Sequence, residues 1–336
     1  MKESTDKRLS KRKMLLLCAA FVLALIALYM GGRWLENFHA APETRGDLTM
    51  RESVLPSIEH DGVRYRPKQG VTTILLMGID HNSDEERGGT RQGGQADFLQ
   101  LIVMDRKAKE VRRLKIDRDT MTPITVLGVL GTRSGVRTAQ VSLSHGFGDG
   151  GKQSCELTCE AVSNLLMNID IDYYMAMEMD GISALNDMAG GVTVTLEDDF
   201  SAIDATMPKG ATITLKGEQA EIYVRSRRSI GVGTNESRMA RQETYISLLL
   251  DKIQDRINGN RSWIERCYDA MTPYLTTNMS KGRLINDAWA AKDYDHSAVY
   301  SIEGKHEVSD DGFMQFHADE ASIWKAVLAM LYDPVV

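Results

Sequence analysis

The sequence predicts an α/β protein with a central mixed β-sheet flanked by helices on both faces, preceded by one N-terminal transmembrane helix. Short apolar strands alternate with amphipathic helices over residues 71–257, which is typical of a sheet covered by helices. A separate run of seventeen uncharged residues, 14–30, lies close to the N-terminus. The 336 residues are 43% hydrophobic and 26% charged, which excludes collagen-like, low-complexity and wholly disordered chains.

The N-terminal residues favour a single-pass membrane anchor. Six Lys or Arg residues precede position 14, and residues 14–32 approach the roughly 20 residues that a helix needs to cross a bilayer. Because the basic flank precedes the span, we expect residues 1–13 in the cytoplasm and the main domain outside the cell membrane. A cleaved signal peptide begins in a similar way and remains an alternative, although this apolar run is longer than usual for one.

The charge balance excludes a general nucleic-acid-binding surface. The chain has 40 basic and 47 acidic residues and a net charge of −7, whereas binding to a nucleic-acid backbone requires a basic footprint. The part that follows residue 13 is more acidic still, because the first thirteen residues contain six basic and only two acidic residues. Any anion that this part binds must therefore be held by a local cluster of arginines.

Three parts are expected after the span. Residues 33–70 are polar, contain three prolines and predict a stalk; residues 71–257 predict the main domain, and residues 258–336 a mostly helical extension that packs on its core. The spacing of apolar residues predicts strands at 73–78, 98–104, 111–116, 173–179, 190–196 and 298–303, and helices at 153–168, 181–189, 217–227, 238–257 and 319–332.

The cysteines do not indicate a disulfide scaffold. Four cysteines are too few for one in a chain of this size. Cys155 and Cys159 stand one helical turn apart in a predicted helix. Such a bridge is strained in a regular helix, so the residues alone leave both a disulfide and two buried thiols open.

Two aspartates are candidate metal ligands. Asp80 ends the first predicted strand of the main domain, and Asp97 begins the next one after a Gly-rich loop. Two carboxylates at adjacent strand ends can share a hard cation such as Mg²⁺, although the spacing equally allows Asp80 to cap a turn. The seven histidines show no pair at metal-ligand spacing, so no zinc site is expected.

Arginines near predicted helix ends are the strongest sign of an anion site. Arg225 and Arg227 lie at the end of one predicted helix, and Arg238 and Gln242 share a face at the start of the next. Arg118 directly follows a predicted strand. Forked guanidinium donors at helix ends suit a diphosphate. A solvated strip paired with Asp and Glu is the alternative that the spacing leaves open.

Seven short motifs occur in order along residues 70–255. They are ILLMGID (74–80), QADFLQL (95–101), KIDRDT (115–120), DYYMAMEMDG (172–181), GGV (190–192), GEQAEIYVRSR (217–227) and SRMARQ (237–242). Read together, they resemble the LytR-CpsA-Psr family of cell-envelope proteins. The short N-terminal tail, the single span and the exported domain also fit the layout of that family. No single motif is specific, whereas the ordered set is.

The resemblance implies a Mg-dependent glycopolymer–peptidoglycan phosphotransferase at the outer face of the membrane. Such an enzyme moves a glycopolymer from a polyprenyl-pyrophosphate carrier to a peptidoglycan hydroxyl as a phosphodiester. It further implies that Asp80 and Asp97 hold the metal. The pyrophosphate would be bound by five side chains, the first three of them catalytic: Arg118, Arg225, Arg227, Arg238 and Gln242.

The sequence departs from the family pattern at three positions. Gln95, Asn235 and Gln140 stand where many members have Arg, Asp and Lys. One basic contact is thereby missing or supplied by Arg91, and a second positive charge is removed at Gln140. The usual general base is also replaced, so Asp119 or Glu236 becomes the candidate base. These departures keep two alternatives open: a non-catalytic polyprenyl-pyrophosphate-binding envelope protein, and a polyprenyl pyrophosphate hydrolase.

A polyprenyl chain also requires an apolar cleft beside the arginines. Side chains with helical spacing can contribute to such a cleft, although a buried core explains most of them more simply. These candidates are Leu165, Leu166, Ile182, Leu185, Leu248 and Leu249.

Overall fold

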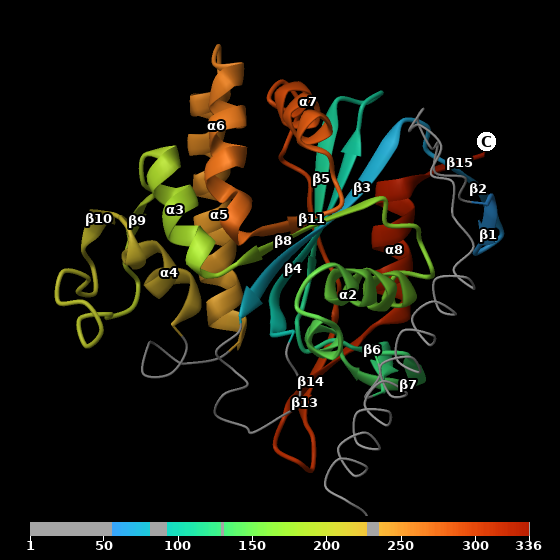
Figure 1. Cartoon of the computed structure of the whole chain (residues 1–336). Helices are drawn as coiled ribbons and strands as arrows, with labels where there is room; N and C mark the ends of the chain where they lie inside the picture. Colours follow the sequence, from blue (N-terminus) through green and yellow to red (C-terminus); the bar gives the residue numbers. More distant parts are fainter. Residues whose placement is uncertain (1–55, 81–92, 129–130, 227–234, 336) are drawn as a thin grey trace, which may run out of the picture. The chain divides into compact units, whose positions relative to one another are not determined.

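A computed structural model describes residues 56–80, 93–128, 131–226 and 235–335 of the chain (Figure 1). The expected cytoplasmic tail, the expected transmembrane helix and most of the expected stalk lie outside these ranges. Within them, no helix is both long enough and apolar enough to cross a bilayer. Residues Glu52–Val336 form one compact unit.

A six-stranded mixed sheet forms the centre of this unit, as the sequence predicts. The strand order is β11-β8-β3-β4-β5-β12. The three middle strands β3, β4 and β5 pair antiparallel, whereas β8 joins β3 and β12 joins β5 in parallel. The strands are β3 (Val71–Asp80), β4 (Gln95–Asp105), β5 (Glu110–Ile116), β8 (Tyr173–Glu178), β11 (Leu275–Thr277) and β12 (Val299–Ser301).

The two central strands are largely apolar on both faces because helices cover both sides of the sheet. Leu75 of β3 and its partner Leu101 of β4 are buried on one face, while Leu76 points to the other face. The strands approach each other closely at Gly78. A Cβ atom at Gly78 would lie 3.0 Å from the Cβ of Phe98, so the glycine lets β3 and β4 stay paired near their ends.

Two helices pack on the first face of the sheet. They are α2 (Lys152–Leu165) and α8 (Glu320–Leu331), which lie on the same side of the sheet in Figure 1. Their apolar side chains join the strands in one buried cluster, to which the sheet contributes Leu101, α2 contributes Val162 and α8 contributes Val327. This cluster is the main hydrophobic core.

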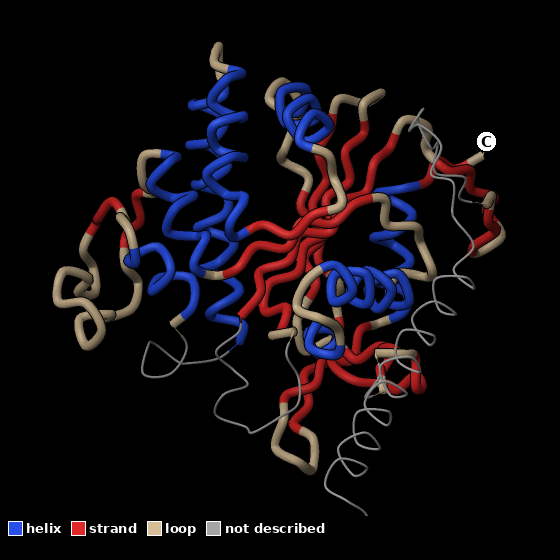
Figure 2. The backbone as a smooth tube through the Cα atoms, viewed as in Figure 1, coloured by secondary structure: helices blue, strands red, loops and turns tan. Residues whose placement is uncertain are grey.

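The other face carries a second group of helices (Figure 2). The α3 helix ends where Gly190 takes a φ of 96°, a left-handed conformation that favours glycine. The α7 helix begins at Ser280, whose side chain accepts a hydrogen bond from the backbone N–H of Arg283. The helices of this group are α3 (Asp180–Ala189), α4 (Glu218–Arg225), α5 (Asn235–Ile257), α6 (Arg261–Met271) and α7 (Lys281–Ala291).

Small sheets and short helices complete the unit. β6 and β7 form one hairpin, β13 and β14 another, and β9 pairs with β10. Their bounds are β6 (Met121–Leu127), β7 (Arg133–Gln140), β9 (Thr193–Thr195), β10 (Thr212–Thr214), β13 (Gly304–Val308) and β14 (Met314–Ala318), and the short helices are η2 (Val141–Phe147) and η3 (Thr272–Tyr274).

Part of the segment expected to form a stalk instead belongs to the compact unit. Residues assigned to the stalk form two strands, β1 (Ile58–His60) and β2 (Val63–Pro67), which pair with each other. β2 also pairs with β15 (Tyr332–Pro334) at the other end of the chain. The prediction failed here because strands this short depend on a partner that is remote in sequence.

The C-terminal residues 258–336 supply strands as well as the expected helices. Besides three helices they supply β11 and β12, which are the two edge strands of the central sheet, and the β13–β14 hairpin. The central sheet is therefore completed only by this part of the chain. The sequence predicts β12 within residues 298–303. The other short strands carry too few residues for a clear alternation of apolar and polar side chains.

The cysteines of the described residues are free thiols. Cys155 is buried, and Cys159 and Cys267 are partly buried. Burial in apolar surroundings raises the pKa of the Cys155 thiol to about 12. The question left open by the sequence is thus answered for this pair: the structure holds two thiols in α2 and no bridge between them.

Candidate active site

The two candidate metal ligands lie at one end of the central sheet. β3 ends at Asp80, and β4 begins with Gln95 directly opposite it. Asp97 follows on β4, beside a shift in the strand register between Gly78 and Ile79. The sequence prediction that the two aspartates occupy adjacent strand ends is confirmed by this pairing.

Arg118 is held in place from three sides. Its Nη1 donates to Asp97, and its Nη2 donates to the side-chain oxygen of Gln95 at 2.8 Å. Its Nε lies 3.4 Å from a carboxylate oxygen of Asp119. Gln95, which stands where a basic residue was expected, therefore orients the neighbouring arginine. Asp119 is buried on the Nε side of Arg118.

Arg225 occupies the C-terminal end of α4 and forms a forked contact with Asp80. Its Nη2 and Nε donate to the two carboxylate oxygens at 2.7 and 3.3 Å, and its Nη1 donates to Glu221 at 2.9 Å. Burial alone would lower the pKa of this guanidinium, but the charges of Asp80 and Glu221 outweigh burial and raise it. Arg225 is therefore a permanently charged, oriented donor.

Gln242 lies beside this group on α5. It is buried, and its side-chain nitrogen donates to the backbone oxygen of Val224 in α4 at 3.2 Å. The next residue toward the start of the helix, Arg241, is held instead by the backbone oxygen of Ser226 and stacks over the Phe200 ring. Arg241 thus joins α4 to α5 and takes no part in the group around Asp80.

Three further predicted residues have side chains outside the described part of the structure. Arg227 lies outside the described residues. The backbone of Arg238 lies in α5, and its side chain falls outside the described part of the structure, as does that of Glu236. Their roles stay predictions.

A small pocket lies beside Arg118. It is lined by Asp97, Arg118 and Gln242 from the predicted set, and by Phe98 at the start of β4. The pocket also has two lining residues that the sequence analysis missed, Lys115 of β5 and Glu243 of α5. Lys115 belongs to the KIDRDT motif, which was the signal in the sequence that could have identified it. Its role as a lining residue depends on how α5 crosses the sheet, which the motif does not reveal.

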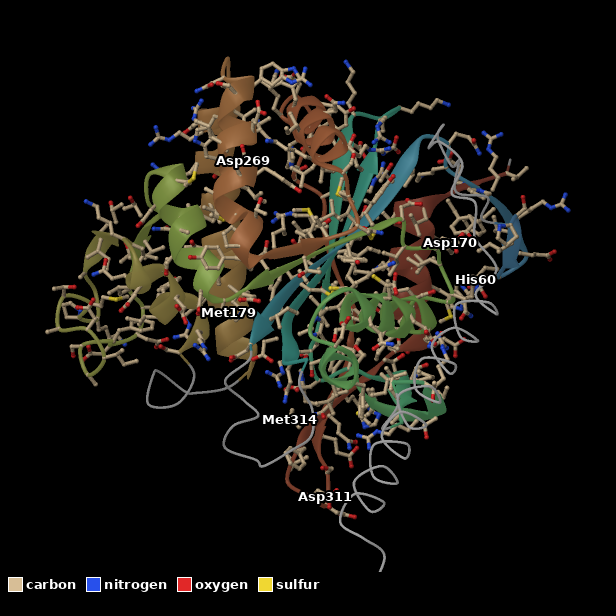
Figure 3. The ribbon with its side chains drawn as sticks, in the orientation of Figure 1. His60, Asp170, Met179, Asp269, Asp311 and Met314 are labelled. Atoms are coloured by element: carbon tan, nitrogen blue, oxygen red, sulfur yellow. The ribbon has the colours of Figure 1, made fainter. Side chains whose placement is uncertain are left out.

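A large apolar cavity adjoins the pocket. It has a volume of about 330 Å³ and lies between the second face of the sheet and the helices α3, α5, α6 and α7. Met179, labelled in Figure 3 between the end of β8 and the start of α3, belongs to its wall. Phe98 and Gln242 line both the cavity and the small pocket. The polar group and the apolar space therefore meet at these two residues.

Only some of the apolar candidates contribute to this cavity. Ile182, Leu185 and Leu249 line it. Leu165 and Leu166 belong to the core on the opposite face of the sheet. Leu and Ile residues at helical spacing look the same in both environments, so the sequence could not separate cleft from core.

The donor set suits a hard cation more than a soft one. Among the described residues, no group of three or more His, Cys, Asp or Glu side chains is arranged around a common metal position. Asp80 and Asp97 offer carboxylate oxygens beside two arginines. Mg²⁺ is commonly held by one or two carboxylates together with phosphate oxygens, so this pair fits Mg²⁺ in the presence of a phosphate ligand.

Comparison with known proteins identifies relatives of this chain. A polyisoprenyl-teichoic acid–peptidoglycan teichoic acid transferase TagU of Bacillus subtilis is 26% identical over 323 residues, covering 95% of both chains. TagV of the same organism, which is named for the same activity, is 28% identical over 281 residues, covering 81% of this chain and 65% of the relative.

Solved structures show the same fold. The crystal structure of Bacillus subtilis TagV superposes with a TM-score of 0.60 at 23% identity, covering 77% of this chain and 95% of TagV. A structure described as TagT bound to LI-WTA superposes with a TM-score of 0.60 at 20% identity, covering 84% and 96%. The sequence profile of the LytR_cpsA_psr family matches residues 43–329. The chain therefore belongs to the LytR_cpsA_psr family.

Proposed function

We propose that the protein is a phosphotransferase that moves a glycopolymer from a polyprenyl-pyrophosphate carrier to a peptidoglycan hydroxyl. It would act at the outer face of the cell membrane, anchored by a transmembrane helix over residues 14–32. One observation carries the proposal: the small pocket that contains Arg118 and the apolar cavity share Phe98 and Gln242. A ligand with an anionic head and a long apolar tail would occupy both spaces at once.

The relatives support the same reaction class. TagU and TagV carry names that specify transfer of teichoic acid from a polyisoprenyl carrier to peptidoglycan. The sequence similarity to TagU extends over 95% of this chain.

Positioning and charge stabilisation account for most catalysis of phosphoryl transfer. Arg118 and Arg225 would bind the non-bridging oxygens of the pyrophosphate through their forked donors. Asp97 and Asp80 hold these guanidinium groups in their orientation before the ligand arrives, so little reorganisation accompanies binding. Asp119 would act through Arg118, because it is buried against the Nε side of that residue.

Asp80 and Asp97 would also hold Mg²⁺. When bound, the ion would neutralise charge on the transferring phosphoryl oxygens. The two carboxylates stand at neighbouring strand ends, and each contacts one of the two arginines. The same carboxylates would therefore link the metal and the arginines around one phosphate group.

The reaction is tested by supplying the purified full-length protein with a labelled polyprenyl-pyrophosphate-linked glycopolymer and peptidoglycan oligomers. We expect the label to move to the oligomers. Release of free phosphate without transfer would instead indicate a hydrolase. Recovery of unchanged lipid bound to the protein would indicate a binding protein without turnover.

Filling part of the apolar cavity is expected to weaken binding of the lipid. Ile246 lines the cavity from α5, and Ile246→Trp should fill part of the space that the tail requires. The affinity for the lipid should fall about tenfold or more, because each excluded methylene group removes close to 1 kcal/mol of apolar burial. Lipid retention on the immobilised protein measures the effect.

The matched control changes a neighbour on the same helix. Leu248 packs against the α3–α4 side of α5 and does not line the cavity. Leu248→Trp should therefore retain the lipid. Equal retention by the Ile246→Trp variant and the wild type would show that the cavity does not receive the tail.

Removal of Mg²⁺ is expected to stop transfer. Chelation should abolish the activity, and added Mg²⁺ should restore it. Asp80→Asn should raise the Mg²⁺ concentration for half-maximal rate at least about tenfold, because changes outside the first ligand shell already cost that much. Glu221→Gln is the control, since Glu221 contacts the same Arg225 from within α4. An unchanged Mg²⁺ requirement in Asp80→Asn would argue against this ligand.

A further inference from the structure

The sheet face beneath α5 carries a polar cluster that the mechanism above does not use. Gln100 of β4 and Lys115 of β5 are cross-strand partners, and Arg113 follows two residues away on the same face of β5. Glu243 of α5 lies above them, 3.5 Å from Arg113 and 3.4 Å from Lys115. We call Gln100, Arg113, Lys115 and Glu243 the β4–β5 polar cluster.

Hydrogen-bond donors exceed acceptors in this cluster. The Arg113 side chain is 7% exposed, and its Nε and Nη1 have no hydrogen-bond partner among the described residues. Gln100 is 1% exposed, and both atoms of its amide group are without a partner in the same part of the structure. One carboxylate faces two cations, so the cluster carries one excess positive charge.

Such an arrangement is costly without a ligand. A buried polar group that lacks a hydrogen bond destabilises the folded state, and a partly compensated buried cation does so more strongly. An anion with several acceptor oxygens would satisfy the donors and cancel the excess charge. The β4–β5 polar cluster therefore has the composition of an anion subsite.

The cluster lies where the pocket and the cavity meet. Lys115 and Glu243 line the small pocket together with Arg118. Gln100 lines the apolar cavity. A pyrophosphate with its outer phosphate at Arg118 and its tail in the cavity would bring the phosphate next to the lipid toward Lys115.

We propose that Lys115, supported by Arg113 and Gln100, binds the lipid-side phosphate and stabilises it as the leaving group. The inference rests on the proposed function. When the acceptor hydroxyl oxygen bonds to the polymer-side phosphorus, the bond from that phosphorus to the bridging oxygen breaks. Its electron pair stays on the bridging oxygen, the hydroxyl proton passes to solvent, and polyprenyl monophosphate leaves with one additional negative charge. The Lys115 ammonium faces that charge.

Two substitutions that should change the binding affinity in opposite directions test the subsite. Binding of farnesyl monophosphate and farnesyl pyrophosphate to the full-length protein in detergent is measured by titration calorimetry. Lys115→Met should weaken binding of the monophosphate about tenfold, because it removes a charge-assisted contact. Glu243→Gln should strengthen binding several-fold, because it removes the carboxylate that competes with the ligand. Lys115→Arg should bind like the wild type.

The control is the same Lys→Met substitution at the opposite end of the β4–β5 pair. Lys107 is exposed in the turn between β4 and β5, and Lys107→Met should leave both affinities unchanged. Thermal unfolding of each variant verifies that it is folded. If Lys115→Met and Glu243→Gln both bind like the wild type while Arg118→Ala binds more weakly, the subsite is wrong and the proposed function stands.

Three other outcomes also decide whether the subsite exists. Weaker binding by both Lys115→Met and Glu243→Gln would overturn the subsite, because the charge argument requires opposite signs. If the wild type binds neither farnesyl compound, the proposed function fails and this inference fails with it. Opposite shifts in the two variants, with Lys107→Met unchanged, would support it.

Discussion

Arg118→Ala is expected to lower the rate of polymer transfer about a thousandfold, the scale at which a single arginine stabilises a phosphoryl-transfer transition state. The loss is large for a structural reason. Arg118 is held by Asp97, Gln95 and Asp119, so its removal leaves two carboxylates facing an anionic substrate. Arg118→Lys should recover only part of the rate, because an ammonium group cannot form the same fork.

Initial rates of label transfer to peptidoglycan oligomers measure this effect. The control is Arg133→Ala, since Arg133 is an exposed arginine paired with Glu160 of α2. That variant should transfer at the rate of the wild type. A rate loss of less than about tenfold in Arg118→Ala would remove Arg118 from the reaction, because a bound phosphate contact alone exceeds that value.

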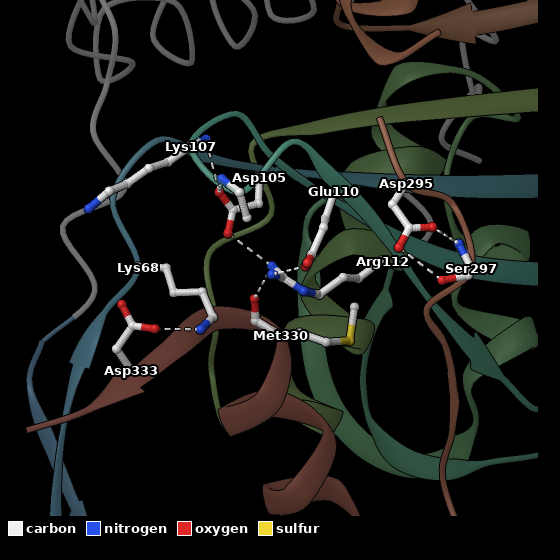
Figure 4. Close-up of polar contacts among 10 residues, drawn as sticks. Lys68, Asp105, Lys107, Glu110, Arg112, Asp295, Ser297, Met330 and Asp333 are labelled. Carbon is white, nitrogen blue, oxygen red and sulfur yellow. Dashed lines mark hydrogen bonds and ion pairs between the residues drawn. The ribbon is translucent and has the colours of Figure 1, made fainter. Parts of the chain in front are cut away.

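Asp105→Ala is expected to lower the free energy of unfolding by about 3–5 kcal/mol, as the loss of one partner in a buried ion pair does. Asp105 accepts from Arg112 at 3.1 Å, and the side chains are 7% and 9% exposed (Figure 4). Its other oxygen accepts from the backbone N–H groups of Lys107 and Ala108. The substitution therefore removes one of the negative charges that compensate the buried Arg112 guanidinium. It also removes the acceptor of two backbone hydrogen bonds in the β4–β5 turn.

Urea unfolding followed by circular dichroism measures this stability. Asp333→Ala is the matched control, because Asp333 pairs with Lys68 in the same region of Figure 4 but is 46% exposed. That pair should contribute under about 1 kcal/mol. Equal losses in the two variants would show that burial does not determine the strength of these ion pairs.

The central part of the fold could be predicted from the sequence because its signals are local. The apolar run that ends at Asp80, the turn between β4 and β5, and the helical spacing of α2 and α5 each lie within about twenty residues. The sequence also predicted that Asp80 and Asp97 lie close together, since they flank a single loop between consecutive strands. Arg118 was recognised through its motif at the end of β5.

Other features depend on contacts between distant segments. β2 pairs with β15 across most of the chain, and neither strand is long enough to indicate a partner. Lys115 becomes part of the pocket only because Glu243 and Gln242 of α5 lie over β5. The position of α5 over the sheet follows from packing of the whole unit, which the spacing of apolar residues does not encode.

The origin of the two edge strands has a consequence for how the protein matures. β11 and β12 flank the central sheet on opposite sides, and both come from the last quarter of the chain. During synthesis, the inner strands emerge first and present unpaired backbone groups until those later segments arrive. A polypeptide cut short before residue 275 would retain Asp80, Asp97 and Arg118 yet lack both flanking strands. Its open borders would favour association with other chains before a working enzyme could form.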